Sequence, residues 1–262
     1  MLIKSQTAKD DVYSKAETDP RLDRFGSTRR TLARRAHARF VRRRSEPLRS
    51  VFYEHLRHLP HLLGSFVRRY PKAEPRLKIT NRANVLSSLA ANESDLYVMG
   101  QPPEELPVIE YPFLENVLVV VARPDHPLAG EKAITLERIA EERFVGRETG
   151  SGTRKAVEQM FAEKNLKIVP YIELASAEAI KQGVIGGLGI AVLSLHSLHF
   201  ELEAGALVVL DVTGFPLRRR WYAAHRKGKR LSRAAQTFLT YPEEEGEQEV
   251  AHLLTPGHDD RP

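Results

Sequence analysis

The stretch Glu148-Thr149-Gly150-Ser151-Gly152-Thr153-Arg154 contains the residue types that bind an oxyanion. Its small and hydroxyl-bearing residues come just before a predicted helix, whose first turn carries free N–H groups and the positive end of the helix dipole. Glycine lets the backbone approach a ligand closely, and Ser or Thr adds hydroxyl donors. The pattern predicts a phosphate or carboxylate site, although a simple helix cap with turn glycines would have the same sequence. No Lys-Ser/Thr pair follows the glycines, which argues against a nucleotide-hydrolysing P-loop.

Polar residues also follow other predicted strands. Thr80, Asn81 and Arg82 come after one strand and open a helix, Gly100-Gln101 follows a second strand, and Ser194 ends a third. Ligands of open parallel sheets bind beyond the carboxyl ends of the strands. We therefore expect these groups and the hydroxyl-rich helix start to converge on one cleft.

Residues typical of catalytic and metal sites are scarce. The sequence has no H-E-x-x-H or G-x-S-x-G motif, and His126, His196, His199 and His225 are scattered. We expect His196 and His199 to lie on a helix as surface or interface residues. Because the chain has 0 cysteines, disulfides, thiolate metal sites and cysteine nucleophiles are excluded. We expect no catalytic residue, metal or cofactor, so the chain is predicted not to be an enzyme.

Composition and charge separate the two ends of the chain from its middle. The 262 residues, 42% of them hydrophobic, suffice for a buried core, and no apolar run approaches the ~20 residues that span a bilayer. The N-terminus lacks the apolar segment of a secretory signal, so we expect a cytoplasmic protein with no membrane partner. The formal net charge is +6, and the basic stretch 24–44 contains no acidic residue. Segment 1–58 is predicted to be a poorly ordered basic tail, a non-specific nucleic-acid-binding arm or a misassigned start, and 241–262 an acidic, then Gly- and Pro-rich tail.

Apolar periodicity between these ends predicts an alternation of helices and strands, which favours parallel pairing through helical crossovers. The run 116–122 is continuously apolar, as in a strand buried on both faces. Ser176 is placed to cap a helix that ends near Ile185. The predicted helices are 59–69, 83–91, 135–140, 155–164, 177–185, 195–203 and 232–239. The predicted strands are 76–80, 96–99, 108–113, 116–122, 143–146, 168–174, 207–211 and 219–224, and the stretch 186–194 is predicted to be a turn and a buried strand.

Several long motifs together resemble one family. They are PHLLGSFVRRYP, RLKITNR, LAANESDLYVMGQPPEE, PFLENVLVVVARPDHPLAG, FVGRETGSGTR, SAEAIKQGVIGGLGIAVLSLHSL and GFPLRRRWY. The stretch of about 60–239 resembles the effector-binding domain of LysR-type transcriptional regulators, above all the regulators of RuBisCO and Calvin-cycle operons. The resemblance implies an α/β fold of two Rossmann-like lobes joined by crossing strands, like a type 2 periplasmic binding protein, with the ligand in the cleft between the lobes.

Mapped onto this sequence, the resemblance implies an effector domain at 59–240. Lobe one comprises 59–121 and 212–240, and lobe two comprises 122–211. The positions that match the family's ligand cleft are Thr80, Asn81, Arg82, Gly100, Gln101, Glu148, Thr149, Gly150, Ser151, Gly152, Thr153 and Ser194. The implied effector is a small anionic metabolite: a phosphorylated sugar, a related carboxylate or NADPH. The resemblance also implies a homodimer or tetramer that pairs through 59–69, 76–80 and 195–203.

The sequence departs from the family in two places. Segment 1–58 contains no recognisable winged helix-turn-helix or linker helix, so DNA, the partner that the family implies, has no evident reading head here. The stretch 52–58 matches neither the first strand nor the loop that the family implies, which leaves the completeness of lobe one open. Three alternatives remain: a stand-alone, truncated or remnant regulator that only binds small molecules without specific DNA binding, a sugar-phosphate enzyme, for which Glu148 is the one candidate catalytic base, and a non-functional gene remnant.

Overall fold

A computed structural model describes residues 51–54 and 59–241. The described residues form two compact units, which we call the outer unit (51–54, 59–114 and 220–241) and the central unit (115–219). These boundaries lie several residues away from the predicted ends of the two lobes. The basic segment 1–50, the stretch 55–58 and the tail 242–262 lie outside the described residues.

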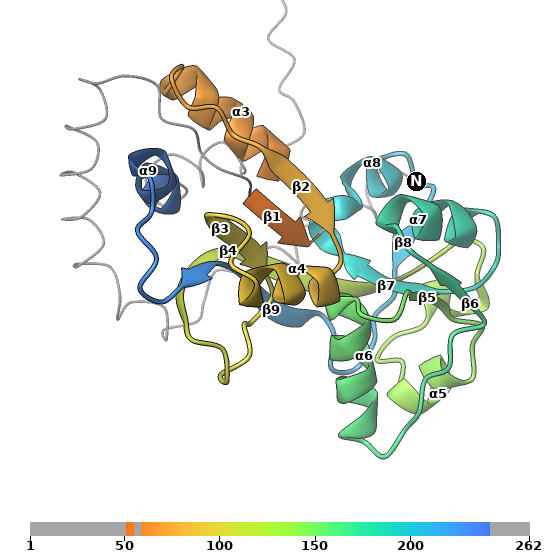
Figure 1. Ribbon diagram of the computed structural model, residues 1–262. Helices are drawn as coiled ribbons and strands as arrows, with labels where there is room; N and C mark the ends of the chain where they lie inside the picture. Colours follow the sequence, from red (N-terminus) through yellow and green to blue (C-terminus); the bar gives the residue numbers. More distant parts are fainter. Residues whose placement is uncertain (1–50, 55–58, 242–262) are drawn as a thin grey trace, which may run out of the picture. The chain divides into compact units, whose positions relative to one another are not determined.

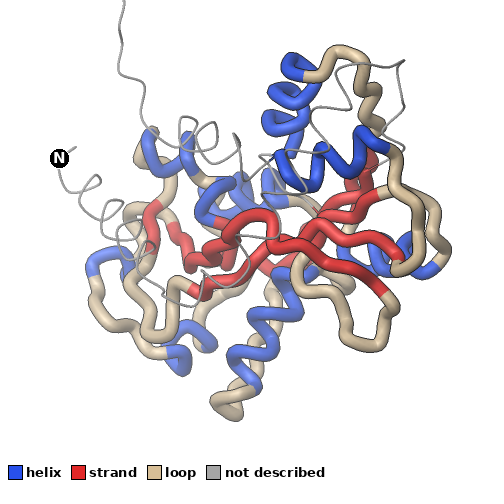
Figure 2. The backbone as a smooth tube through the Cα atoms, turned by 90° about the vertical axis from the view of Figure 1, so that its left-hand side faces the viewer, coloured by secondary structure: helices blue, strands red, loops and turns tan. Residues whose placement is uncertain are grey.

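The described chain alternates helices (blue) and strands (red) along most of its length (Figure 2). The outer unit contains β1 (Val51–Glu54), α3 (Leu59–Arg69), β2 (Leu77–Thr80), α4 (Arg82–Ala90), β3 (Leu96–Met99) and α9 (Arg233–Tyr241). Two long strands, β4 (Val108–Ala122) and β9 (Leu217–Arg226), continue from one unit into the other. The central unit adds η2 (Pro127–Gly130), α5 (Leu136–Ala140), β5 (Val145–Arg147), α6 (Gly152–Ala162), β6 (Ile172–Leu174), α7 (Ala177–Ile185), β7 (Ala191–Ser194), η3 (Leu195–Ser197), α8 (His199–Glu203) and β8 (Val208–Val209).

The strand β1 supplies the first strand that could not be recognised in the sequence at 52–58. It pairs in parallel with both β2 and β3, with Val51 opposite Leu77 on one side and opposite Leu96 on the other. In Figure 1, β1 lies between its two neighbours. The sheet therefore has its central strand, within the stretch that matched no strand of the family. A four-residue strand beside an Arg-rich segment has little pattern of its own, and its sheet partners decide its conformation.

The outer unit encloses a core between its first and last helices. The predicted apolar face of α3 is buried through Leu62, Leu63 and Phe66. The ring of Phe66 packs edge-on against Phe238 of α9 with 5.2 Å between centroids. The helix at the end of the described chain therefore completes the core that the first helix begins, as an amphipathic pair should.

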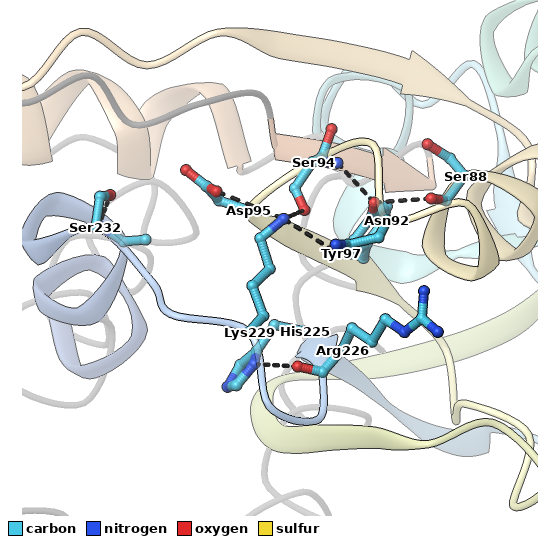
Figure 3. Close-up of polar contacts among 10 residues, drawn as sticks. Ser88, Asn92, Ser94, Asp95, Tyr97, His225, Arg226, Lys229 and Ser232 are labelled. Carbon is cyan, nitrogen blue, oxygen red and sulfur yellow. Dashed lines mark hydrogen bonds and ion pairs between the residues drawn. The ribbon is translucent and has the colours of Figure 1, made fainter.

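A polar clip joins the loop between β9 and α9 to the turn between α4 and β3 (Figure 3). Lys229, in the loop between β9 and α9, donates through Nζ to Asn92 Oδ1 at 3.0 Å and to the Ser94 carbonyl at 2.6 Å. Its Nζ also lies 3.6 Å from Asp95 Oδ1. Beside it, the buried Tyr97 hydroxyl accepts the Ser94 N–H at 2.7 Å and donates to a carbonyl of α4. The clip fixes the turn between α4, which begins at the predicted binding residue Arg82, and β3, which is followed by Gly100 and Gln101.

The central unit is built around β4 and β7, which pair antiparallel from Leu118 opposite Ser194 to Val121 opposite Ala191. Leu118 and Val120 belong to one buried cluster, whereas Val119 and Val121 belong to another. The prediction of a strand buried on both faces is thus confirmed. The prediction of two strands, 108–113 and 116–122, was wrong because the chain stays extended through Leu114 and Glu115 and forms one strand. Pro112 lies within this strand, and a proline is tolerated in a strand where no ladder N–H is needed.

Three more predicted boundaries differ from the structure. The helix expected from 155 begins at Gly152, since glycines that favour a turn also fit a helix's first turn. The strand expected at 168–174 is ordered as a strand only at Ile172–Leu174. The helix expected at 195–203 divides into η3 and α8 at Leu198.

His196, expected as a surface or interface residue, has both ring nitrogens buried, and this burial lowers its pKa.

Candidate anion-binding site

The hydroxyl-rich motif forms a tight turn that connects β5 to α6. The Ser151 N–H donates to the Glu148 carbonyl at 3.2 Å, and Gly150 adopts a φ of 89°. A residue with a side chain rarely adopts this left-handed conformation, so glycine suits the position. The turn places Ser151 at the N-cap position and Gly152 and Thr153 in the first turn of α6. Both β5 and α6 are labelled in Figure 1.

The N-cap of α6 differs from the N-caps of α4, α5 and α7. Asn81 of α4, Thr135 of α5 and Ser176 of α7 each accept a hydrogen bond from the backbone N–H three residues on. Ser151 makes no such bond. Ser151 is 2% exposed, and its Oγ has no hydrogen-bond partner among the described residues. A buried hydroxyl without a partner is costly, so this group is suited to an acceptor that comes from outside the chain.

The first turn of α6 contains no acidic residue that would compete with an anion. Arg147 holds Glu148 with two hydrogen bonds, Nε to Oε2 at 2.8 Å and Nη2 to Oε1 at 3.0 Å. Arg154 pairs with Glu158 and Glu173, and these carboxylates raise its pKa. The carboxylates around this helix start are therefore paired with guanidinium groups.

Further contacts hold the start of α6 in place. Arg219 of β9 donates through Nη1 to the Gly152 carbonyl at 3.0 Å, and Arg154 donates to the Arg147 carbonyl at 3.2 Å. Arg147, Thr153 and Arg154 also line one small pocket between β5 and α6. A fixed helix start with N–H groups, a hydroxyl and a positive dipole end can bind a phosphate or carboxylate group.

Some of the predicted binding residues of the outer unit already have hydrogen-bond partners within this unit, whereas others keep a donor for a ligand. Asn81 Oδ1 caps α4, and Thr80 Oγ1 accepts from Asn84 at 3.0 Å, so both already have a partner. Arg82 donates through Nη2 to the Gln101 carbonyl, which brings these two predicted residues together. Gln101 donates to Glu110, and Gly100 is buried.

Arg82 provides the available cation of this group. Its Nη1 is buried and has no hydrogen-bond partner within 51–54 and 59–241. A guanidinium has five N–H donors, so Arg82 keeps donor capacity beyond its bond to Gln101.

The side chains of Ser194 and Thr149 make fewer hydrogen bonds with the described residues than those of Thr80 and Asn81. Ser194 makes no cap bond to η3, and its carbonyl accepts from Ser197 Oγ at 2.7 Å. Thr149 is exposed. Arg147 and Arg219 were missed as site residues: Arg147 directly precedes the motif, and Arg219 lies in a basic run that has the pattern of a solvated face.

The part of the chain that the structure describes contains no group of three or more His, Cys, Asp or Glu residues placed to hold a metal ion. Among the same residues, no helix combines the length and apolarity required to cross a bilayer.

The comparisons with known proteins agree with the resemblance. Residues 51–246 match the model of the LysR substrate binding domain. The chain is 52% identical over 183 residues to the HTH-type transcriptional activator CmpR of Synechocystis sp., which covers 70% of this chain and 60% of that protein. It is 50% identical over 182 residues to a RuBisCO operon transcriptional regulator of Allochromatium vinosum, again covering 70% and 60%. The chain thus spans about 60% of the length of these curated relatives.

Solved structures give the same fold. The regulatory domain of Synechocystis CcmR in complex with 2-PG matches with a TM-score of 0.70 and 41% identity, covering 79% of this chain and 97% of that domain. The effector binding domain of QuiR in complex with shikimate matches with a TM-score of 0.68 at 20% identity, which supports the fold alone. The predicted α/β fold of the type 2 periplasmic-binding-protein class is confirmed.

Proposed function

Because the chain belongs to the LysR substrate binding domain family, we propose that it senses a small anionic metabolite for a transcriptional regulator of carbon-fixation genes. The unpartnered, buried Ser151 hydroxyl at the start of α6 carries this proposal, since an acceptor group of a bound anion would satisfy it. The relative named as an HTH-type transcriptional activator supports the role in transcription regulation, and the relatives named as RuBisCO operon transcriptional regulators support the carbon-fixation role. The CcmR domain in complex with 2-PG supports a small organic anion as the effector.

We assign the anionic group of the effector to Ser151, Gly152 and Thr153. Glu148, Thr149 and Gly150 shape the turn that presents these donors. The remaining predicted residues, Thr80, Asn81, Arg82, Gly100, Gln101 and Ser194, stay proposed as effector-binding residues. Among these residues, Arg82 is the best candidate to bind an anionic group, because its guanidinium retains a buried N–H group without a described partner.

The partners and the location are part of the proposal. We infer that the protein acts on DNA, as the names of its HTH-type transcriptional relatives imply, and that it does so as a homodimer or tetramer in the cytoplasm. We infer that it does not catalyse a reaction, since the acidic residue nearest the site, Glu148, is bound through both oxygens to Arg147.

Thermal unfolding of the purified chain tests the proposal. Its midpoint is measured with 2-PG, phosphorylated Calvin-cycle sugars, small carboxylates and NADPH. An effector present at 100 times its Kd adds about 2.7 kcal/mol to the free energy of unfolding. We expect at least one phosphorylated compound to raise the midpoint in this way.

The variant Ser151→Ala connects the effect to the site. Loss of a hydrogen bond to a charged group costs about 1.5–3 kcal/mol, so the affinity should fall about 10- to 100-fold. Ser176→Ala is the matched control, because it removes the N-cap of α7 and leaves α6 intact. A midpoint that no compound changes, or an equal effector shift in Ser151→Ala and the wild type, would contradict the assignment.

A further inference from the structure

We propose that Glu148 selects the anion bound at the start of α6. It favours an oxyanion that carries an O–H donor, such as a monoprotonated phosphate ester, over one that carries none, such as a sulfate ester. The inference rests on the proposed function, because it concerns the anionic group held by the same turn.

The position of Glu148 makes its charge relevant to the site. Its carbonyl accepts the Ser151 N–H, so the residue opens the four-residue turn that ends at the buried hydroxyl. Its side chain is 20% exposed, and that of Arg147 is 7% exposed. Solvent screens such a charge only weakly, so a ligand at the helix start experiences it.

The geometry of the pair determines what Glu148 offers to a ligand. Arg147 Nε and Nη2 occupy one site on each carboxylate oxygen, at 2.8 and 3.0 Å. An ionised carboxylate has about four lone-pair sites, so about two sites remain, and both can only accept hydrogen bonds. A ligand O–H can donate to such a site, whereas a fully deprotonated oxygen is repelled by it.

Arg147 fixes the orientation of the Glu148 carboxylate. A bidentate guanidinium fixes the plane of the carboxylate, and the Arg147 carbonyl is itself held by Arg154 at 3.2 Å. The pair has no net charge, so the N–H groups, the Ser151 hydroxyl and the dipole of α6 provide the general attraction for anions. Glu148 then distinguishes between anions by their protonation.

Phosphate and sulfate esters differ in this property near neutral pH. The second pKa of a phosphate monoester is about 6, so part of its population retains an O–H group. A sulfate monoester carries no such proton. Effectors with a hydroxyl close to the anionic group would satisfy Glu148 in the same way.

Binding of methyl phosphate and methyl sulfate, measured by calorimetry at equal ionic strength, tests the inference. At about pH 6, where the monoprotonated ester is abundant, wild-type protein should bind methyl phosphate at least about tenfold more tightly than methyl sulfate. In Glu148→Gln, this preference should fall to about threefold or less, mainly because methyl sulfate binds more tightly once the repulsive charge is removed. Glu163→Gln, the same change at the other end of α6, should keep the wild-type preference.

A second measurement requires no variant. Raising the pH to about 8 removes the proton from the phosphate ester, so the wild-type preference for methyl phosphate should shrink while methyl sulfate binding changes little. A preference that is the same in Glu148→Gln and the wild type, or that is independent of pH, would overturn the inference. If both probes bind and Ser151→Ala weakens both, the proposed function stands even when Glu148 fails. If neither probe binds the wild type, both fail.

Discussion

Replacing Lys229 by methionine should destabilise the outer unit, because the polar clip has no other described cation at its centre. The Nζ group donates to Asn92 and to the Ser94 carbonyl and lies 3.6 Å from the Asp95 carboxylate (Figure 3). The Lys229 side chain is 15% exposed and that of Asp95 is 9% exposed, so water replaces these contacts poorly. Charged hydrogen bonds of this kind contribute about 1.5–3 kcal/mol each, and their loss is partly offset by relaxation. We expect a net loss of about 2–4 kcal/mol in the free energy of unfolding.

Equilibrium urea unfolding of Lys229→Met measures this loss. The midpoint of thermal unfolding should fall by roughly 4–16 °C for a domain of this size. Lys227→Met is the matched control, since Lys227 is exposed and its change should stay within about 0.5 kcal/mol. If Lys229→Met costs no more than Lys227→Met, the clip does not hold the α4–β3 turn.

Three further predictions follow from the fold. Gly189→Ala should abolish soluble expression of the folded chain, because a Cβ at this position, which has a φ of 144°, would overlap the carbonyl oxygen of Arg143; a folded variant with a wild-type midpoint would contradict this. Tyr53→Pro should prevent cooperative unfolding as seen by circular dichroism, since proline removes an N–H from the strand between two parallel neighbours; an unchanged transition would remove β1 from the sheet. Burial lowers the pKa of His225, so below about pH 6.5 the unfolded chain binds a proton that the folded chain resists, and stability should fall on acidification; His225→Phe should reduce this slope in pH-dependent urea unfolding, and an unchanged slope would contradict the assignment.

The regular elements with strong apolar patterns could be predicted from the sequence. The run 117–121 predicted a strand buried on both faces, and Ser176 predicted a cap that the structure confirms with a bond to the Ala179 N–H. The strand β1 could not be predicted, because four residues carry too little periodicity and their conformation depends on β2 and β3. The division of the helix at Leu198 has no sequence signal that we can identify.

The sequence predicts which residue types lie near the candidate site, but it does not predict their hydrogen-bond partners. Ser151 and Ser176 look alike in the sequence, since each precedes a helix, yet only Ser176 caps its own helix. Asn81 and Thr80 are polar residues at a strand end, but their side chains are used by α4. The partnership of Arg147 with Glu148 depends on side-chain geometry, which residue types and spacing do not specify.

Anion binding at the start of α6 is tested most directly by the response of individual backbone amides to a bound anion, measured by NMR during a titration with methyl phosphate. We expect the amide signals of Ser151, Gly152 and Thr153 to shift in proportion to binding, while those at the start of α7, which is already capped by Ser176, stay in place. Binding that leaves the amides of 151–153 unchanged would contradict the assignment of the anion site to the start of α6.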